Sequence, residues 1–128
     1  MGASDVETVR GGYEAFGRQD IPGVLAVFAD DIEWTTPDSL PVGGTVRGPD
    51  GVAGFFQSLP RYYPELRVEP DEFLDAGDSV VVLGHHRGRA AGGEFDAPFA
   101  HVWTMSGGKA KRFREYNDSA ALLRVLEA

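Results

Sequence analysis

The chain has 128 residues, no cysteine and a formal net charge of −8. Its length suits one domain covering residues 1–128, and its 42% hydrophobic content is enough for a packed core, which excludes a disordered chain. The lack of cysteine excludes disulfides and thiolate chemistry, the acidic excess argues against nucleic-acid binding, and no apolar run approaches the length of a membrane span.

The first half of the chain has the residue spacing of three helices. A capping-box pattern from Ser4 to Glu7 predicts the start of the first helix, Asp20 is expected to cap the second, and Pro49 suits the first turn of the third. We expect Pro60 to end the third helix, because a proline interrupts the helical hydrogen bonds. Each helix carries an apolar stripe at helical intervals: Val6, Val9, Tyr13 and Phe16; Ile21, Val24, Leu25 and Phe28; Val52, Phe55, Phe56 and Leu59.

The second half changes to a period of two, which is typical of strands. The pattern predicts four strands joined by short turns: residues 66–75, 79–90, 94–106 and 109–117. An earlier strand, 32–36, ends at Pro37 and precedes a loop, and Asp118 or Ser119 caps a short final helix. Helices followed by an antiparallel meander indicate the α+β class, with a pocket where the long strands curve away from the helices.

Four segments of the chain follow one another in an order and spacing that is typical of a known protein family. They are residues 28–37 (FADDIEWTTP), 46–51 (VRGPDG), 80–89 and 108–118. Together they resemble the SnoaL-like and ketosteroid isomerase-like proteins of the nuclear transport factor 2-like superfamily. The resemblance implies a cone-shaped α+β barrel, in which three N-terminal helices pack on a highly curved mixed or antiparallel sheet before a short C-terminal helix. It also implies a pocket inside the cone and often a homodimer. It does not imply one reaction, because the superfamily contains isomerases, polyketide cyclases, epoxide hydrolases, dehydratases and non-catalytic binders.

His101 is the first candidate for chemistry, because an imidazole changes protonation near neutral pH. Strand alternation places Phe99, His101 and Trp103 on one face, which we assign to the pocket because these side chains are large. In the SnoaL-like pattern this strand position often carries a catalytic histidine or acid. A core histidine hydrogen-bonded to a neighbour is the alternative.

The partner of His101 depends on the register of the last hairpin. A two-residue Gly107–Gly108 loop pairs His101 with Arg114, whereas a loop one residue longer, with a glycine bulge, pairs it with Glu115. We favour Glu115, because burying two arginines costs more than burying one carboxylate beside a histidine. In related cyclases and epoxide hydrolases the matching position is an inward-facing acid. A His101–Glu115 pair suits proton transfer, and a mutually satisfied buried pair is the equally weighted alternative.

Aromatic and polar side chains complete the predicted pocket. We expect His86 to face inward and its neighbour His85 outward, and for Phe55 an ordinary core position is favoured over a place in the pocket wall. The predicted substrate-binding residues are Tyr13, Trp34, Phe55, Tyr63, His86, Phe99, Trp103, Phe113 and Asn117. His86, His101 and Glu115 have the side chains to form a three-ligand metal site, but they lack the spacing of a metal motif, so we expect no metal and no cofactor.

Two departures from the family patterns bear on the reaction. Thr36 stands where the ketosteroid isomerase pattern has its general-base aspartate, and Gly12 stands near the place of its oxyanion-binding tyrosine, so steroid isomerisation is not expected. Of the epoxide hydrolase Asp–Arg–Asp set only the second acid is kept, as Glu115. His86 and Gly88 replace the arginine and the first aspartate.

The sequence therefore predicts a cofactor-independent isomerase- or cyclase-type enzyme, in which His101 and Glu115 move a proton on an apolar carbonyl-containing small molecule. A non-catalytic small-molecule binder of the same fold and a protein-interaction scaffold are the alternatives. The expected partners are an apolar ligand and a second copy of the chain bound through the sheet, with no nucleic acid and no membrane. Because the N-terminal segment lacks the apolar core of a secretory signal, we expect a cytoplasmic location.

Overall fold

One curved sheet and the helices around it make up the protein. The computed structural model describes residues 2–126, and within them six strands form a single sheet in the order β2-β1-β6-β5-β4-β3. The pair β1 and β6 is parallel, and the other neighbouring pairs are antiparallel. The elements are α1 (Gly2–Gly17), α2 (Ile21–Leu25), β1 (Phe28–Thr36), β2 (Gly44–Arg47), α3 (Gly48–Tyr62), β3 (Glu65–Ala76), β4 (Ser79–Ala90), β5 (Gly93–Ser106), β6 (Lys109–Asn117) and α4 (Ser119–Leu126).

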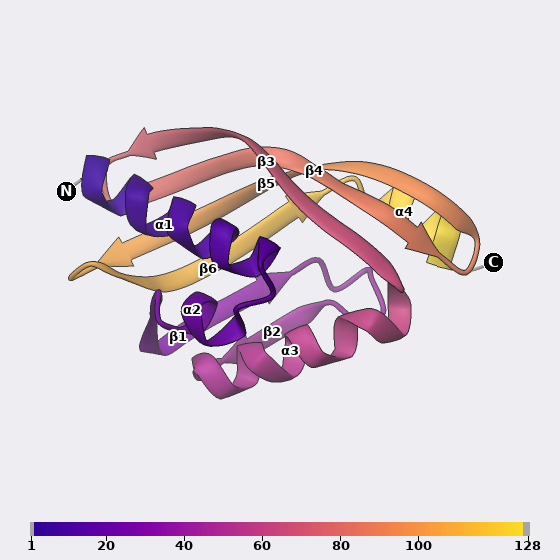
Figure 1. Cartoon of the computed structure of the whole chain (residues 1–128), viewed down its shortest axis with the longest axis horizontal. Coiled ribbons are helices and arrows are strands. Elements are labelled where there is room, and N and C mark those ends of the chain that lie inside the picture. The colour runs from indigo at the N-terminus through magenta and orange to yellow at the C-terminus, as the bar shows by residue number, and fades with distance from the viewer. Residues whose placement is uncertain (1, 127–128) are drawn as a thin grey trace.

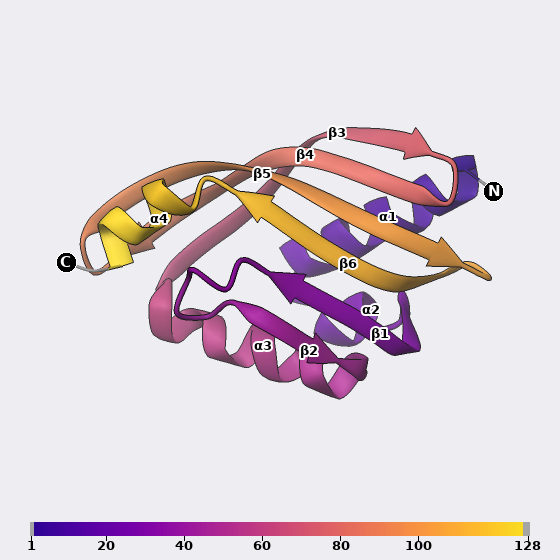
Figure 2. The same ribbon diagram turned by 180° about the vertical axis from the view of Figure 1, so that it is seen from behind.

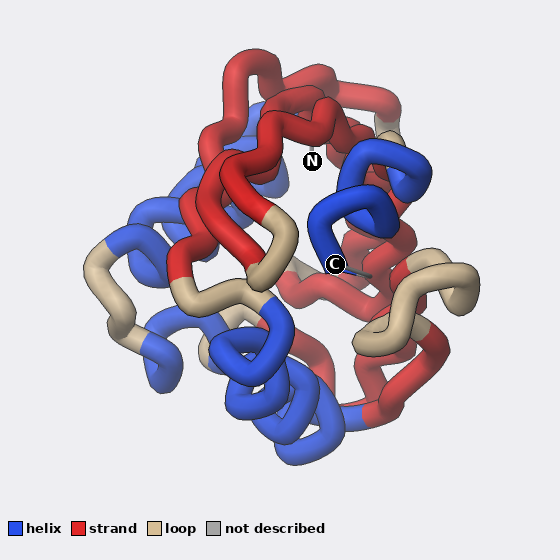
Figure 3. Tube along the Cα trace, turned by 90° about the vertical axis from the view of Figure 1, so that its right-hand side faces the viewer, coloured by secondary structure: helices blue, strands red, loops and turns tan. Residues whose placement is uncertain are grey.

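The helices cover the concave side of the sheet and one of its ends. Helix α1 lies against β3 and β4, α3 against β1 and β2, and α4 against one end of β5 (Figures 1 and 2). Seen end-on, strands and helices surround a common interior (Figure 3). This arrangement confirms the predicted α+β cone with three N-terminal helices and a short C-terminal helix. None of the helices within residues 2–126 has the length and apolar character needed to cross a membrane.

The core falls into two clusters along the cone. The larger lies between the first three helices and the sheet and includes Val9, Ile32, Trp34, Val82 and Phe113. The smaller lies at the α4 end and is formed by Leu40, Tyr63, Ala90, Phe95, Ala97 and Leu122. Apolar side chains therefore run along the whole interior of the cone, and the buried polar residues Thr36, His86 and His101 lie among them.

Glycines on the inner face of β4 allow β3 to approach closely. A Cβ at Gly84 would lie 2.8 Å from both Pro70 Cα in β3 and the Phe99 ring, and one at Gly88 would collide with the backbone of Glu65. The β3–β4 register shifts between Pro70 and Glu72, beside Gly84. Glycines in a strand commonly mark such close backbone approaches and bends. The inward curl of β3 therefore depends on these two positions.

The register of the last hairpin pairs His101 with Glu115, as predicted, but for a different reason. Gly107 and Gly108 form a two-residue turn with φ of +58° and +79°, the backbone of a type I′ hairpin. The extra residue is Lys111 in β6, because Met105 pairs with Ala110 whereas Thr104 pairs with Arg112. A β-bulge inside the strand, and not a longer loop, therefore turns Glu115 inward.

Several predicted boundaries were wrong. Helix α1 begins at Gly2, so Ser4 lies inside it and not at its cap. Helix α3 continues through Pro60 to Tyr62, because this proline lies in the last turn and the Tyr63 N–H still reaches Leu59 O at 2.8 Å. Strand β1 begins at Phe28, where a helix was expected, and β2 occupies part of the predicted loop.

Replacing Gly84 by alanine is expected to lower the free energy of unfolding by about 1–3 kcal/mol, because the new methyl group collides with the backbone of β3 and the ring of Phe99. Urea denaturation measures the change. Gly54→Ala in α3 is the matched control: its Cβ meets no atom within 4 Å, and it is expected to add about 0.5–1 kcal/mol. Equal stabilities for wild type and Gly84→Ala would show that the close approach is not required.

Candidate active site

Three adjacent strands bring three polar side chains to the inner face of the sheet. His86 comes from β4, His101 from β5 and Glu115 from β6. His86 and His101 are buried, with 8% and 4% of their surface exposed, and the side chain of Glu115 is 12% exposed. Because inner-face residues alternate with outer-face residues, His85 lies on the opposite face, as predicted.

These side chains line a partly open cavity of about 90 Å³ between the helices and the sheet. The cavity is lined by most of the predicted site residues: Tyr13, Trp34, Phe55, Tyr63, His86, His101, Trp103, Phe113, Glu115 and Asn117. Phe99 is the exception. It is buried with its ring stacked on His101 at 3.8 Å between centroids, so it supports the imidazole and does not line the cavity.

Part of the cavity wall was not predicted from the sequence. Leu40 and Val42 reach the cavity from the segment between β1 and β2, and Leu122 reaches it from α4. Their approach depends on the tertiary fold, so no local pattern identified them. Phe16, Phe56 and Leu59 also line it, and their helical stripes were visible in the sequence as core positions.

Tyr13 and Trp103 hold one side of His101. The Trp103 indole N–H donates to Tyr13 Oη at 3.0 Å, and Tyr13 Oη lies 2.5 Å from His101 Nδ1. Burial, and secondarily the charge of Glu115, raises the pKa of Tyr13 well above its usual range, although the Trp103 N–H opposes this rise. Tyr13 therefore stays protonated and has a hydroxyl proton to donate to His101. This role was not predicted, because Tyr13 and His101 are 88 residues apart.

Glu115 holds the other side of His101. His101 Nε2 lies 3.1 Å from Glu115 Oε1, and Asn117 Nδ2 donates to Glu115 Oε2. Ser119 Oγ donates to Asn117 Oδ1 at 2.7 Å, which turns the amide N–H of Asn117 toward the carboxylate. Burial alone would raise the pKa of Glu115, but the hydrogen bond from His101, the positive charge that the two histidines carry once they are protonated in acid, and the Asn117 N–H lower it to about 2.

The hydrogen bonds assign the tautomer of His101. An ionised carboxylate only accepts hydrogen bonds, so His101 Nε2 carries a proton. Tyr13 Oη accepts a hydrogen bond from the Trp103 indole N–H, so the Tyr13 hydroxyl proton points to another acceptor. That acceptor is the lone pair on His101 Nδ1. Both ring nitrogens of His101 are therefore engaged within the protein, and the imidazole fixes the position of Glu115.

His86 differs from His101 in having a free ring edge. Its Nε2 lies 3.9 Å from Glu115 Oε1, beyond hydrogen-bond distance, and its ring packs on Phe99 at 4.6 Å between centroids. Burial lowers the pKa of His86 to about 4, against a smaller opposing effect of the Glu115 charge. His86 is therefore neutral near pH 7. Burial also raises the pKa of Tyr63, another lining residue, to about 12.

The same three residues are a possible set of metal ligands. Among residues 2–126, the ligand atoms of His86, His101 and Glu115 all lie within 4.8 Å of one another. Two imidazoles and a carboxylate form a common catalytic zinc ligand set. A metal bound there would have to replace the present hydrogen bond between His101 and Glu115.

The fold and the site together define a class: a cone-shaped α+β protein with an apolar cavity that carries one buried, ionised carboxylate. The model of the SnoaL-like domain matches residues 9–113, and the chain belongs to this family. This confirms the family resemblance of the sequence.

Solved structures and curated proteins of similar sequence cover nearly the whole chain. An NTF2-like protein of unknown function from Burkholderia pseudomallei is 41% identical, with 98% of each chain covered and a TM-score of 0.91. TerC, crystallised with polyporic acid, is 32% identical, with 98% of this chain and 99% of TerC covered and a TM-score of 0.91. An uncharacterized protein from Mycobacterium tuberculosis is 29% identical over 121 residues, which is 92% of each chain.

The buried neutral His86 makes stability depend on pH. Its pKa is about 4 in the folded protein against an ordinary value of 6.5, so the unfolded chain binds more protons between these values. The contribution of His86 to the free energy of unfolding is fully present above pH 6.5 and is lost as the pH falls toward 4. The total loss is about 3 kcal/mol. Urea denaturation across this range is expected to show the loss in wild type and in His85→Phe, but not in His86→Phe. If His86→Phe leaves the pH dependence of the free energy of unfolding unchanged, other groups cause the loss of stability.

Proposed function

We propose that the protein is a cofactor-independent acid–base enzyme of the isomerase or cyclase type, acting on an apolar carbonyl-containing small molecule. The observation that carries this proposal is an ionised carboxylate, Glu115, held in an apolar cavity by donors on fixed strands. A charged base in a largely water-excluded site acts without the reorganisation that water would require.

In the proposed reaction Glu115 takes a proton from a carbon next to the carbonyl group. The C–H electron pair becomes a C=C bond, and the carbonyl oxygen gains the negative charge. Neutral His86 donates an N–H to that oxygen, in the manner of an electrophilic imidazole. Because Glu115 has a low pKa, it holds the transferred proton weakly and returns it readily to the carbon skeleton or to the oxygen.

His101 and Asn117 act as positioning residues in this scheme. Each donates one hydrogen bond to a different oxygen of Glu115, which fixes the plane of the carboxylate. Tyr13 supports the scheme indirectly, because it sets the tautomer in which His101 donates. TerC, a 32% identical relative crystallised with polyporic acid, supports the view that a cone of this kind accommodates a small organic molecule.

A non-catalytic binder is the second candidate, and one observation favours it. The pKa of Glu115 is about 2, well below the neutral range in which a general base is most effective. In a binder the carboxylate and His86 would only orient a ligand within the apolar walls. The two candidates differ in one measurable property, which is proton exchange on a bound ketone.

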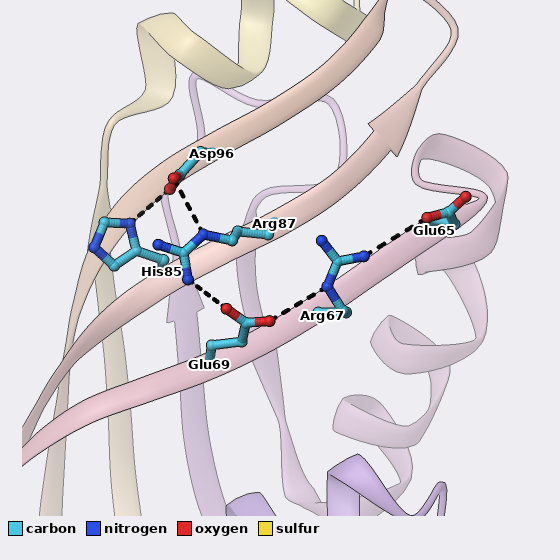
Figure 4. Close-up of polar contacts among 6 residues, drawn as sticks. All are labelled: Glu65, Arg67, Glu69, His85, Arg87 and Asp96. Carbon is cyan, nitrogen blue, oxygen red and sulfur yellow. Dashed lines mark hydrogen bonds and ion pairs between the residues drawn. The ribbon is translucent and has the colours of Figure 1, made fainter.

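We also propose that the chain forms a homodimer through the outer face of the sheet. This face carries an outer patch of apolar side chains, Leu74, Val81, Leu83, Ala100, Val102 and Tyr116, of which Leu74 and Tyr116 are 44% and 56% exposed. On one side of the patch lies a ladder of alternating charges from Glu65 to Asp96 and His85 (Figure 4). An apolar centre with rims of both charges suits a two-fold contact between identical surfaces.

The dimer is tested by light scattering on the purified chain. The expected mass is twice the 13.8 kDa of one chain. Val102→Asp places a charge at the centre of the outer patch and is expected to give monomers, whereas Ser39→Asp, on an exposed loop, adds the same charge elsewhere and leaves the dimer intact. A monomeric wild-type chain would contradict this proposal.

The enzymatic proposal is tested by deuterium uptake from heavy water into 2-indanone, an enolisable ketone, followed by proton NMR. Wild type is expected to accelerate the exchange, and Glu115→Gln to reduce the accelerated rate about hundredfold or more, because the amide cannot accept the proton. Glu33→Gln, on the outer face in contact with Arg47 and Arg112, is the matched control and should retain the wild-type rate. Exchange that survives in Glu115→Gln would remove Glu115 as the base, and binding of the ketone without exchange would favour the binder.

A further inference from the structure

The separation between His86 and Glu115 restricts what can bind between them. His86 Nε2 and Glu115 Oε1 lie 3.9 Å apart, and neither atom reaches the other. Hydrogen bonds to oxygen have donor–acceptor distances of about 2.7–3.2 Å. A single oxygen atom placed beside this pair therefore reaches both atoms at normal hydrogen-bond length, with an angle near a right angle at the oxygen.

Glu115 and His86 require opposite hydrogen-bonding roles of that oxygen. Glu115 is an ionised carboxylate and accepts hydrogen bonds only. His86 is neutral. The tautomer with its proton on Nε2 is favoured, because a lone pair on Nε2 would face the negative carboxylate of Glu115. The bridging oxygen must therefore accept a hydrogen bond from His86 and donate one to Glu115. A hydroxyl group does both, whereas a carbonyl or ether oxygen has no proton to donate.

We propose that the cavity selects ligands that place a hydroxyl oxygen between His86 Nε2 and Glu115 Oε1, with His86 as the donor that holds this oxygen beside the carboxylate. The inference rests on the proposed function, because the enol of a carbonyl substrate carries such a hydroxyl. In that form the proton taken by Glu115 from carbon has been delivered to oxygen, so the tautomerisation balances without a further reactant. Phenol is a stable analogue of an enol.

The rest of the ligand is apolar. Trp103 and Phe113 lie on the cavity wall beside the polar group, and their rings lie 4.6 Å apart between centroids. The cavity of about 90 Å³ is smaller than the dry apolar cavity of about 150 Å³ that takes benzene in another protein, but it is partly open, so it suits a ligand with no more than a single ring. A ring with one hydroxyl group is therefore the smallest ligand that meets both conditions.

The experiment compares phenol with fluorobenzene, which has nearly the same shape but no hydroxyl proton. The chain contains two tryptophans, Trp34 and Trp103, and both line the cavity, so their indole N–H signals in proton–nitrogen NMR report binding. In wild type, phenol is expected to bind about tenfold to hundredfold more tightly than fluorobenzene, the usual effect of a hydrogen bond to a charged group. His86→Phe should lower this preference by about threefold to tenfold, because phenol then loses the hydrogen bond from His86 and keeps only the one to Glu115.

His85→Phe is the matched control, because it makes the same replacement on the adjacent residue of the opposite face and should keep the full preference. If His86→Phe does not fold, His86→Leu serves as the donor-free variant. His86→Gln, which keeps an N–H donor, is expected to retain part of the preference. Each variant is first compared with wild type by circular dichroism.

Equal affinities of wild type for the two ligands would overturn the inference, as would a preference that the donor-free variant keeps in full. Either result would leave the proposed proton transfer standing, since that depends on exchange into the ketone and on Glu115→Gln. Failure of both ligands to perturb the indole signals would overturn the hydroxyl inference and remove the small-molecule cavity on which the proposed function rests.

Discussion

The hydrogen bond between His101 and Glu115 depends on one extra residue in β6. Without the bulge at Lys111, the Gly107–Gly108 turn would pair His101 with Arg114 and place the arginine side chain inside the cone. With the bulge, Glu115 lies inside and is held at 3.1 Å from His101 Nε2. The polar group, the ionised state of Glu115 and the position of His86 beside it all follow from this local shift in register.

A buried carboxylate is costly unless its oxygens are hydrogen-bonded. The protein meets this requirement with His101 on one oxygen and Asn117 on the other. Behind His101, Tyr13 links the sheet to α1, so a helix at the start of the chain contributes to the geometry of a site on three later strands. Of the three side chains, His86 is the one left with a free edge toward the cavity, and in the proposed reaction this difference separates the positioning role of His101 from the ligand contact of His86.

The period-two pattern of the second half was sufficient to predict the long strands to within one or two residues, because inner and outer residues alternate in β4 with little exception. The inward position of Glu115 followed from the cost of burying arginines. The bulge itself was not predictable, because Lys111 has no local feature that marks it. Strand β2 was missed because its four residues form a strand only by pairing with β1. The hydrogen bond of Tyr13 and the contacts of Leu40 and Leu122 depend on elements that meet only in the folded chain.

The hydrogen-bonding scheme around Glu115 can be tested through the protonation of the two inner histidines. Long-range proton–nitrogen NMR of the imidazole rings at neutral pH identifies which nitrogen of each ring carries hydrogen. We expect His101 to be protonated on Nε2 alone, with Nδ1 accepting from Tyr13, and Tyr13→Phe to shift mainly the Nδ1 signal of that ring. We also expect His86 to be neutral. A His101 ring protonated on Nδ1 alone would contradict this hydrogen-bonding scheme, because Nε2 would then present a lone pair to the Glu115 carboxylate.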